Sequence, residues 1–134
     1  MEFKTSVIIL SYNNFEETTG PCLASLFKNG DDNRFEIIVV DNNSSDGSAE
    51  KIEKATAGHN GVKIVLNCEN RGFAGGNNDG AEMATGEILI LLNSDTIIPP
   101  GELFKLSTLM QENNDWAMLG PVTNQAGNEQ KIYT

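Results

Sequence analysis

The sequence predicts an α/β fold with a mostly parallel, open sheet that helices cover on both faces. Four short apolar runs lack polar alternation, as is typical of strands buried on both sides, and they occupy residues 6–10, 37–40, 62–66 and 88–92. Segments with helical periodicity separate these runs, which is the pattern of right-handed βαβ units. The 134 residues, of which 39% are hydrophobic, suffice for one domain that needs no disulfide or structural metal.

The helical segments lie between and after these strands. Apolar residues share one face of each segment, Pro21 falls in the first turn of the first one, and the third is rich in glycine. We predict helices over residues 19–28, 48–56, about 75–84, and from Pro99-Pro100 to about residue 112. Residues 117–119 are a candidate fifth strand, and Phe104 and Trp116 are expected in the core.

The charge balance disfavours several classes of partner. Nine Lys and Arg residues face 19 acidic residues, and the cations are scattered between Lys4 and Lys131 without a basic stripe. This argues against nucleic-acid binding and against adhesion to an anionic membrane. Cys22 and Cys68 form no metal-ligand spacing, and the sequence shows no signal peptide, so two reduced thiols in a cytoplasmic protein are expected.

Polar residues follow each of the four predicted strands. In an open α/β sheet, ligands bind beyond the carboxyl ends of the strands. Taken singly, each exit is explained by turn formation and helix capping, but four together favour a site for a sugar or nucleoside. The exits read Ser11-Tyr12-Asn13-Asn14, Asp41-Asn42-Asn43-Ser44-Ser45-Asp46-Gly47, Asn67-Cys68-Glu69-Asn70-Arg71-Gly72 and Asn93-Ser94-Asp95.

Two acids at these exits carry distinct hypotheses. Asp41 ends the second strand, where a carboxylate can accept a hydrogen bond from a ribose hydroxyl or a base N–H, or can stabilise its own turn. Asp95 follows the fourth strand on the same sheet edge, where it can bind a hard divalent cation or cap the loop.

The glycine cluster at residues 72–80 does not match the dinucleotide-binding fingerprint. It follows the third strand, and its spacing is not G-x-G-x-x-G, so a nicotinamide or flavin site is poorly supported. Glycines here are better explained by the amino terminus of a helix that approaches a ligand or another strand closely.

Together these motifs resemble a known family. An apolar strand leads into Ser11-Tyr12-Asn13, followed by the acidic turn at 37–47, the segments 70–74 and 77–80, and a strand that ends in Asn93-Ser94-Asp95. This order is similar to the amino-terminal, nucleotide-binding part of family 2 glycosyltransferases with the A-type fold, closest to the rhamnosyltransferase-like branch. Residues 1–120 would then be a nucleotide-sugar-binding domain, and 121–134 a polar tail leading into an acceptor-binding segment.

The resemblance implies an inverting glycosyltransferase that moves a sugar from a nucleotide diphosphate donor, UDP- or dTDP-type, to an acceptor hydroxyl. It implies a role in polysaccharide biosynthesis with a glycan or lipid-linked acceptor, in the cytoplasm or at the inner face of the membrane. Asp95 would bind Mn²⁺ or Mg²⁺. The residues expected at the nucleotide are Ser11, Tyr12, Asn13, Asp41, Asn43 and Asn78.

Two departures from the family pattern shape these expectations. Asn93 occupies the first acidic position of the metal motif, so Asp95 alone would bind the cation, together with the diphosphate and waters. The catalytic base of the family lies in a later segment, so we expect it beyond Thr134. This chain would therefore be a donor-binding fragment that transfers no sugar by itself.

Three other interpretations stay open. A non-catalytic module that binds a nucleotide or sugar nucleotide accounts for the missing base. A sugar-phosphate nucleotidyltransferase would need a glycine-rich, basic loop after the first strand, and Ser11-Tyr12-Asn13-Asn14 has neither glycine nor cation. A structural or interaction domain is supported only by the acidic, asparagine-rich surface.

Overall fold

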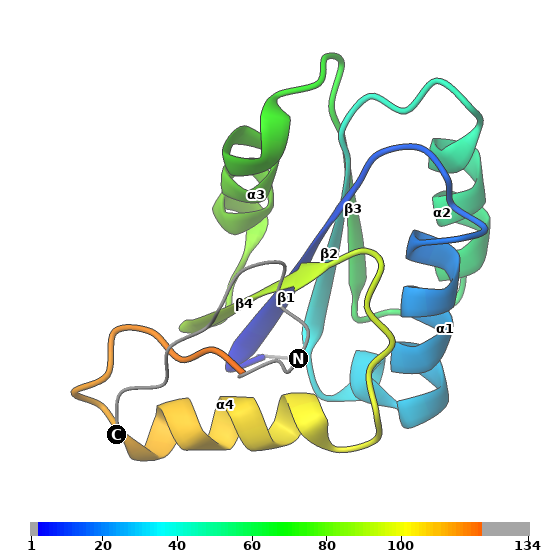
Figure 1. Ribbon diagram of the computed structural model, residues 1–134. Helices are drawn as coiled ribbons and strands as arrows, with labels where there is room; N and C mark the ends of the chain where they lie inside the picture. Colours follow the sequence, from blue (N-terminus) through cyan, green and yellow to red (C-terminus); the bar gives the residue numbers. More distant parts are fainter. Residues whose placement is uncertain (1–2, 122–134) are drawn as a thin grey trace, which may run out of the picture.

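The computed structural model describes residues 3–121 (Figure 1). Strands and helices alternate along the chain, as the sequence pattern predicts. The strands are β1 (Thr5–Ser11), β2 (Glu36–Asp41), β3 (Val62–Leu66) and β4 (Ile88–Asn93). The helices are α1 (Thr19–Asn29), α2 (Ser48–Thr56), α3 (Gly72–Met83) and α4 (Glu102–Glu112), with a short 3-10 helix η1 at Asp31–Asn33.

The strands form a single parallel sheet in the order β3-β2-β1-β4. β1 lies at the centre of the fold between β2 and β4, and the register pairs Ser11 with Asp41 and Leu10 with Asn93. The carboxyl ends of the three strands therefore meet at one edge. This confirms the predicted parallel α/β architecture and brings the predicted site residues to one side of the molecule.

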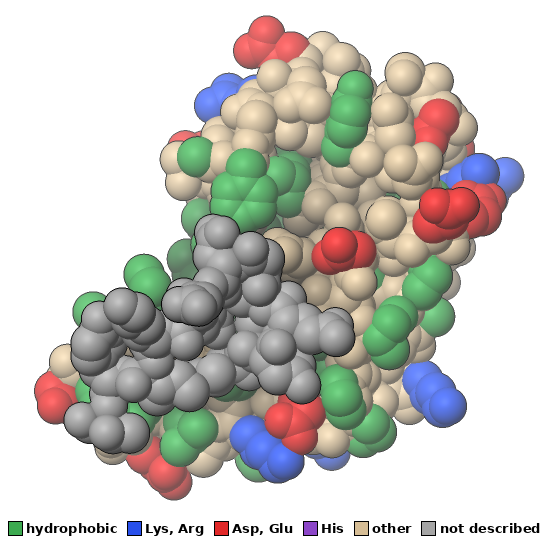
Figure 2. All heavy atoms as spheres, viewed as in Figure 1, with side chains coloured by type: hydrophobic (Ala, Val, Ile, Leu, Met, Phe, Trp, Pro, Cys, Tyr) green, Lys and Arg blue, Asp and Glu red, His purple; other side chains and the backbone are tan. Residues whose placement is uncertain are grey.

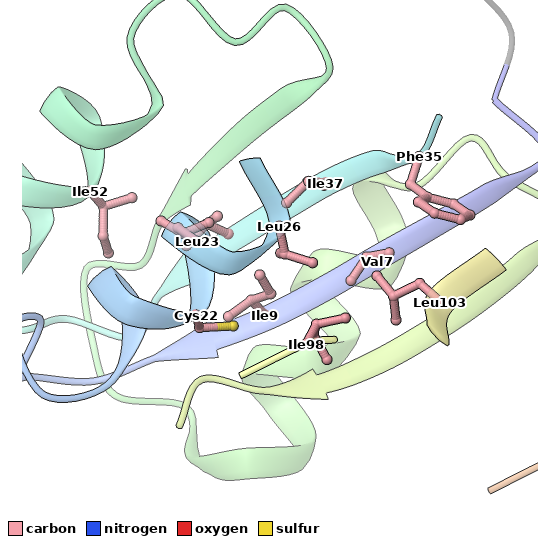
Figure 3. Packing of buried hydrophobic residues seen from close by; sticks show 11 residues of the cluster. Val7, Ile9, Cys22, Leu23, Leu26, Phe35, Ile37, Ile52, Ile98 and Leu103 are labelled. Carbon is pink, nitrogen blue, oxygen red and sulfur yellow. The ribbon is translucent and has the colours of Figure 1, made fainter. Parts of the chain in front are cut away.

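The main core lies on the face of the sheet covered by α1, α2 and α4. Figure 3 shows Leu23 and Leu26 of α1 and Ile52 of α2 packed toward Ile9 and Ile37 of the central strands. These side chains are at most 1% exposed, so each contributes about 1.5–3 kcal/mol of burial free energy.

Within the described part of the chain, α3 is the only helix on the opposite face, where it packs on β1 and β2. Gly76 and Gly80 face the sheet, and a Cβ atom at Gly80 would lie 2.5 Å from Cγ2 of Ile8. A close approach of the helix to a strand is therefore present, but Gly76 and Gly80 make it within the helix and not at its amino terminus, where it was expected. The helix begins at Gly72, earlier than the predicted residue 75, and ends at Met83.

Several sequence expectations need correction. Among residues 3–121, β4 is well covered on one face only, because α3 packs chiefly on β1 and β2, and Leu89 and Leu91 are 45% and 57% exposed. Within residues 3–121 no strand forms at 117–119, where Met118 is 89% exposed. Phe104 and Trp116 are 54% and 42% exposed and thus lie outside the core. The predicted tail at 121–134 falls, apart from its first residue, outside the described residues.

None of the helices within residues 3–121 is long and apolar enough to cross a membrane. On the face shown in Figure 2, the Lys and Arg side chains lie in separate places around the edge of the outline.

Candidate functional site

The loops after β1 and β2 are joined by hydrogen bonds at the carboxyl edge of the sheet. The backbone N–H of Asn13 donates to Oγ of Ser44 over 2.8 Å, and the N–H of Ser45 donates to Oδ1 of Asn13 over 2.9 Å. The N–H of Asn14 donates to Oδ2 of Asp46 over 2.7 Å. The donors around Asp46, first the Ser48 hydroxyl and then the Asn14 amide, lower the pKa of its carboxyl group. The two loops thus form one ordered rim.

The backbone of this rim is strained at three asparagines. Asn13, Asn14 and Asn43 have φ angles of 53°, 55° and 65°, and within residues 3–121 they are the only residues besides glycine with positive φ. Asparagine tolerates this left-handed region better than other side chains do, but such conformations persist where surrounding contacts enforce them, often at functional sites. The predicted site residues Asn13 and Asn43 therefore shape the rim with their backbones.

Asp41 ends β2 with a side chain that is only partly satisfied. The residue is 2% exposed, and its Oδ2 atom accepts a hydrogen bond from the N–H of Ser44 over 2.9 Å. Oδ1 is the one buried side-chain polar atom without a partner in the described part of the chain. An unsatisfied buried acceptor costs about 1–3 kcal/mol, so it marks a position where a ligand donor would be stabilising.

The structure places the neighbouring predicted residues in different environments. Ser11 is buried and its hydroxyl pairs with that of Thr19 at 2.6 Å, so its polar group is already satisfied inside the fold. Tyr12 follows directly and is 51% exposed, with its ring free to contact a ligand.

A cavity of about 360 Å³ opens on the other side of β1, between α3 and the end of β4. Its wall is apolar at Leu10, Phe73 and Leu91, and polar at Asn77, Asn93 and Asp95. Asp41 does not line this cavity. The ends of β2 and β4 are two strand spacings apart, about 10 Å, which an extended nucleoside diphosphate can span.

Asp95 meets the requirements of a hard cation only in part. The carboxylate is exposed and has the oxygens of Asn93 and Ser94 as neighbours, which is the donor chemistry that Mg²⁺ and Mn²⁺ prefer. Within residues 3–121, however, no group of three His, Cys, Asp or Glu side chains could hold a metal. A cation there would need further oxygens from a bound ligand.

Cys22 lies beneath this loop and is fully buried. Its thiol donates to the carbonyl of Asn93 at 4.0 Å. Burial, and then the negative charge of Asp95, raise the pKa of the Cys22 thiol to about 11. The sulfur therefore stays protonated and packs as a small apolar group, without acting as a metal ligand.

Two residues to which the sequence analysis assigned no role also lie at the site. Asn77 is 7% exposed and lines the cavity, whereas the predicted Asn78 is exposed on another side of α3. The helical period separates successive residues by 100°, and the apolar pattern of this glycine-rich helix is too weak to orient it from sequence. Asn42 is buried at 2% exposure, and its side chain connects β2 to the β3–α3 loop.

Proteins of a known family are similar to this chain in sequence. The family model for Glycosyl transferase family 2 matches residues 6–133. The glycosyltransferase YfnE of Bacillus subtilis is 39% identical over 94 residues, which are 70% of this chain and 24% of that protein. The GalNAc(5)-diNAcBac-PP-undecaprenol beta-1,3-glucosyltransferase of Campylobacter jejuni is 33% identical over 113 residues, covering 84% of this chain and 35% of that protein.

Solved structures share the fold. S. aureus TarS 1–349 in complex with UDP-GlcNAc aligns with a TM-score of 0.71 and 29% identity, over 84% of this chain and 32% of that chain. The mannosyltransferase PcManGT from Pyrobaculum calidifontis, in complex with GDP-Man and Mn²⁺, aligns with a TM-score of 0.64 and 24% identity, over 82% and 32% respectively. The chain spans from 24% to 46% of the length of the curated relatives that it matches. Its sheet has the A-type glycosyltransferase architecture, and the chain belongs to glycosyltransferase family 2.

Proposed function

We propose that this chain binds the nucleotide diphosphate sugar donor of an inverting glycosyltransferase. The observation that carries the proposal is the buried, unpartnered Oδ1 of Asp41 at the carboxyl edge of the sheet, next to the exposed Tyr12. The family supports it, since S. aureus TarS is described in complex with UDP and with UDP-GlcNAc.

The chemistry of Asp41 narrows the base. A carboxylate oxygen needs a donor, which the ring N–H of uracil or thymine supplies, whereas the corresponding ring nitrogens of cytosine and adenine are acceptors and only the exocyclic amino groups of these bases donate. Guanine also carries a ring N–H, so a GDP-type donor is the alternative that the nucleotide panel has to separate. We therefore expect a UDP- or dTDP-type donor. Tyr12, Asn13 and Asn43 are proposed to contact it, whereas the buried Ser11 hydroxyl already pairs with Thr19 and Asn78 is exposed on another side of α3.

The diphosphate and a divalent cation would lie toward Asp95. Mn²⁺ or Mg²⁺ bound there would stabilise the negative charge that develops on the leaving nucleotide diphosphate. The single carboxylate and the neighbouring Asn93 and Ser94 would hold it weakly without nucleotide. A neighbour of the same fold is described with both GDP-Man and Mn²⁺.

We propose that the residues that bind and activate the acceptor correspond to the part of the relatives that this chain does not cover. Inversion requires the acceptor oxygen to attack the anomeric carbon as the bond to the diphosphate breaks, and a base must take the acceptor proton. Around the described site, Asp41 and Asp46 accept hydrogen bonds within the rim, and Asp79 pairs with Arg71 at 3.1 Å. We propose that the base lies beyond Thr134.

The acceptor is proposed to be a glycan or a lipid-linked sugar. Relatives from Campylobacter jejuni and Escherichia coli carry undecaprenol-linked acceptors in their names. Such an acceptor would place the whole enzyme at the inner face of the membrane, in polysaccharide biosynthesis.

Thermal unfolding with a panel of nucleotides tests donor binding. UDP or dTDP with Mn²⁺ should stabilise the protein, by about 2.7 kcal/mol at a hundredfold excess over Kd, whereas ADP and CDP should not. Equal shifts with all four would leave Asp41 without a role in base selection. Stabilisation by GDP alone would assign a guanine donor.

A transfer assay separates the enzyme from a non-catalytic binding module. General-base catalysis contributes about 10²–10⁴ in rate, so the 134-residue chain should bind donor without transferring sugar, whereas the full-length parent should turn over. Transfer by the chain itself would require a base among its own residues. A full-length parent that binds but never transfers would support the binding module.

A further inference from the structure

We propose that Asn42 is a positioning residue of the nucleotide site, because it fixes residues 67–72 beside Asp41. This inference rests on the proposed nucleotide binding. Asn42 follows Asp41 in an extended chain, where successive side chains point to opposite faces. Asp41 therefore faces the α1 side of the sheet, and Asn42 faces the α3 side, where residues 67–72 connect β3 to α3.

The carboxamide of Asn42 uses all of its hydrogen-bonding capacity on that segment. Its Nδ2 donates to Oδ1 of Asn70 over 3.0 Å and to the carbonyl of Gly72 over 3.2 Å. Its Oδ1 accepts from Nδ2 of Asn67 over 3.1 Å and from the N–H of Arg71 over 3.0 Å. Four contacts over six residues fix the whole segment, and only a side chain with both donors and acceptors can make them.

The segment is continuous with the nucleotide edge of the sheet. The N–H of Asn67 donates to the backbone carbonyl of Asp41 over 2.9 Å, so the segment begins beside the residue that bears the unpartnered carboxylate. Asn67 at its start and Arg71 near its end both contact Oδ2 of Asp79, at 2.9 and 3.1 Å. With the nucleoside bound at Asp41, as proposed, residues 67–72 would form a wall next to it, and the placement of this wall depends on Asn42.

The substitution Asn42→Asp tests this role with a minimal change of shape. At neutral pH the introduced carboxylate has no donor, and it would face the oxygen of Asn70 and the carbonyl of Gly72. Loss of these two partly buried hydrogen bonds should displace the wall and weaken UDP binding by about tenfold or more, as a penalty of at least 1.4 kcal/mol implies. The measurement is calorimetric titration of UDP with Mn²⁺ at pH 7.5.

A pH series distinguishes positioning from general destabilisation. At pH 4, near the ordinary pKa of an aspartate carboxyl, about half of the introduced groups are protonated and regain one O–H donor, so the deficit of N42D relative to wild type should shrink from pH 7.5 to pH 4. The matched control is Asn29→Asp, which also removes donors, to the carbonyl of Ile98 at 2.9 Å and to Asp31, but lies at the far end of α1. We expect N29D to lower stability and to change UDP affinity by less than about twofold, because it does not touch the wall.

Each outcome decides the inference. Equal UDP affinity of wild type and N42D at pH 7.5, a deficit that does not change with pH, or an equal deficit in N29D would overturn it. If N42D does not fold, Asn67→Ala removes two bonds of the same network, to Asn42 and to Asp79, and unchanged UDP affinity in that variant would overturn the inference instead. Absence of nucleotide binding in the wild type would contradict the proposed function itself.

Discussion

The first and last residues of β2 are both acids, and they are equally buried but differ in how fully their carboxylates are hydrogen bonded. Glu36 and Asp41 are each 2% exposed. Glu36 lies at the amino edge of the sheet and receives hydrogen bonds on both oxygens, whereas Asp41 lies at the carboxyl edge with one oxygen unpartnered. Since the strand and the burial are shared, the difference reflects what each edge is built to do.

At the amino edge, the donors around Glu36 come from three other parts of the fold. Ser6 Oγ donates over 2.5 Å, the N–H and hydroxyl of Thr85 over 2.8 and 3.0 Å, and Lys63 Nζ approaches to 2.5 Å. Burial alone would raise the pKa of the Glu36 carboxyl, but Lys63 and the Ser6 and Thr85 donors outweigh it and lower that pKa to about 2. This edge joins β1, β2, β3 and the α3–β4 turn, and it serves stability.

The largest effect expected from this comparison is a loss of stability when the hydrogen bonds and the ion pair of Glu36 at the amino edge are removed. Glu36→Ala would leave the Ser6 and Thr85 donors without their acceptor, and it should lower the free energy of unfolding by about 3 kcal/mol, since Lys63 is half exposed and can be solvated. Urea denaturation measures it. UDP affinity of the folded variant should stay unchanged, and a matching loss of affinity would show that the two edges are coupled.

The pH dependence of stability sharpens the same point. The Glu36 carboxyl has a folded pKa of about 2 against its ordinary 4.5, so its contribution is complete above pH 4.5 and is lost as the pH falls toward 2. Up to about 3 kcal/mol of unfolding free energy should disappear over that window. Comparing urea midpoints of wild type and Glu36→Gln from pH 6 to 2.5 isolates the group. A constant difference between them across this range would assign the acid sensitivity elsewhere.

Asp41→Asn should act in the opposite sense to the changes at Glu36. The amide keeps an acceptor for the Ser44 N–H and removes the charge that lacks a partner, so stability should not fall. Nucleotide affinity should fall by about 1.5–3 kcal/mol, because a charge-assisted hydrogen bond is lost. Calorimetry with UDP measures the affinity. A variant that unfolds while its remaining folded fraction binds normally would assign Asp41 to its turn.

The smallest effect concerns the metal. Because Asp95 is the only acid among the described cavity-lining residues, a nucleotide diphosphate and Mn²⁺ should strengthen each other's binding, by about 1–3 kcal/mol. Asp95→Asn should remove most of this coupling and leave uridine binding unchanged. UDP titrations with and without Mn²⁺ on both proteins measure it. Equal enhancement by Mn²⁺ in both would reduce Asp95 to a loop cap.

The strand order limits how far burial can be predicted from sequence. The runs in β1 and β2 are buried on both faces, as their composition predicts. The run in β4 has the same apolar composition, yet its alternate residues are exposed because it lies at the edge of the sheet formed by residues 3–121, and α3 packs chiefly on β1 and β2. Edge position arises from long-range topology, which no local pattern contains.

Within the site, residue type was predictable and partner choice was not. The exits of the strands meet at one edge as expected, and Asp41 and Asp95 lie there. The sequence could not show that the Ser11 hydroxyl pairs with Thr19 or that Oδ1 of Asn13 accepts from Ser45, because both partners are fixed only by the folded loops. The alternation of side chains along an extended chain could have predicted that Asn42 and Asp41 face opposite sides of the sheet. The roles of both residues in nucleotide binding stay predictions.

Because α3 lies in close contact with β1, the side chains between them determine the width of the cavity. Gly76 and Gly80 present no side chains, so the height of α3 above the sheet is set by Leu10 and Ile8. Leu10 also forms part of the cavity wall, opposite Phe73 at the start of the same helix. Exchanging Leu10 or Ile8 for a larger or smaller aliphatic residue would raise or lower the helix as a unit and thereby widen or narrow the cavity. The width of the cavity, and with it the proposed choice of donor, can therefore change through the buried Ile8 and the partly buried Leu10, with every polar group of the rim left as it is.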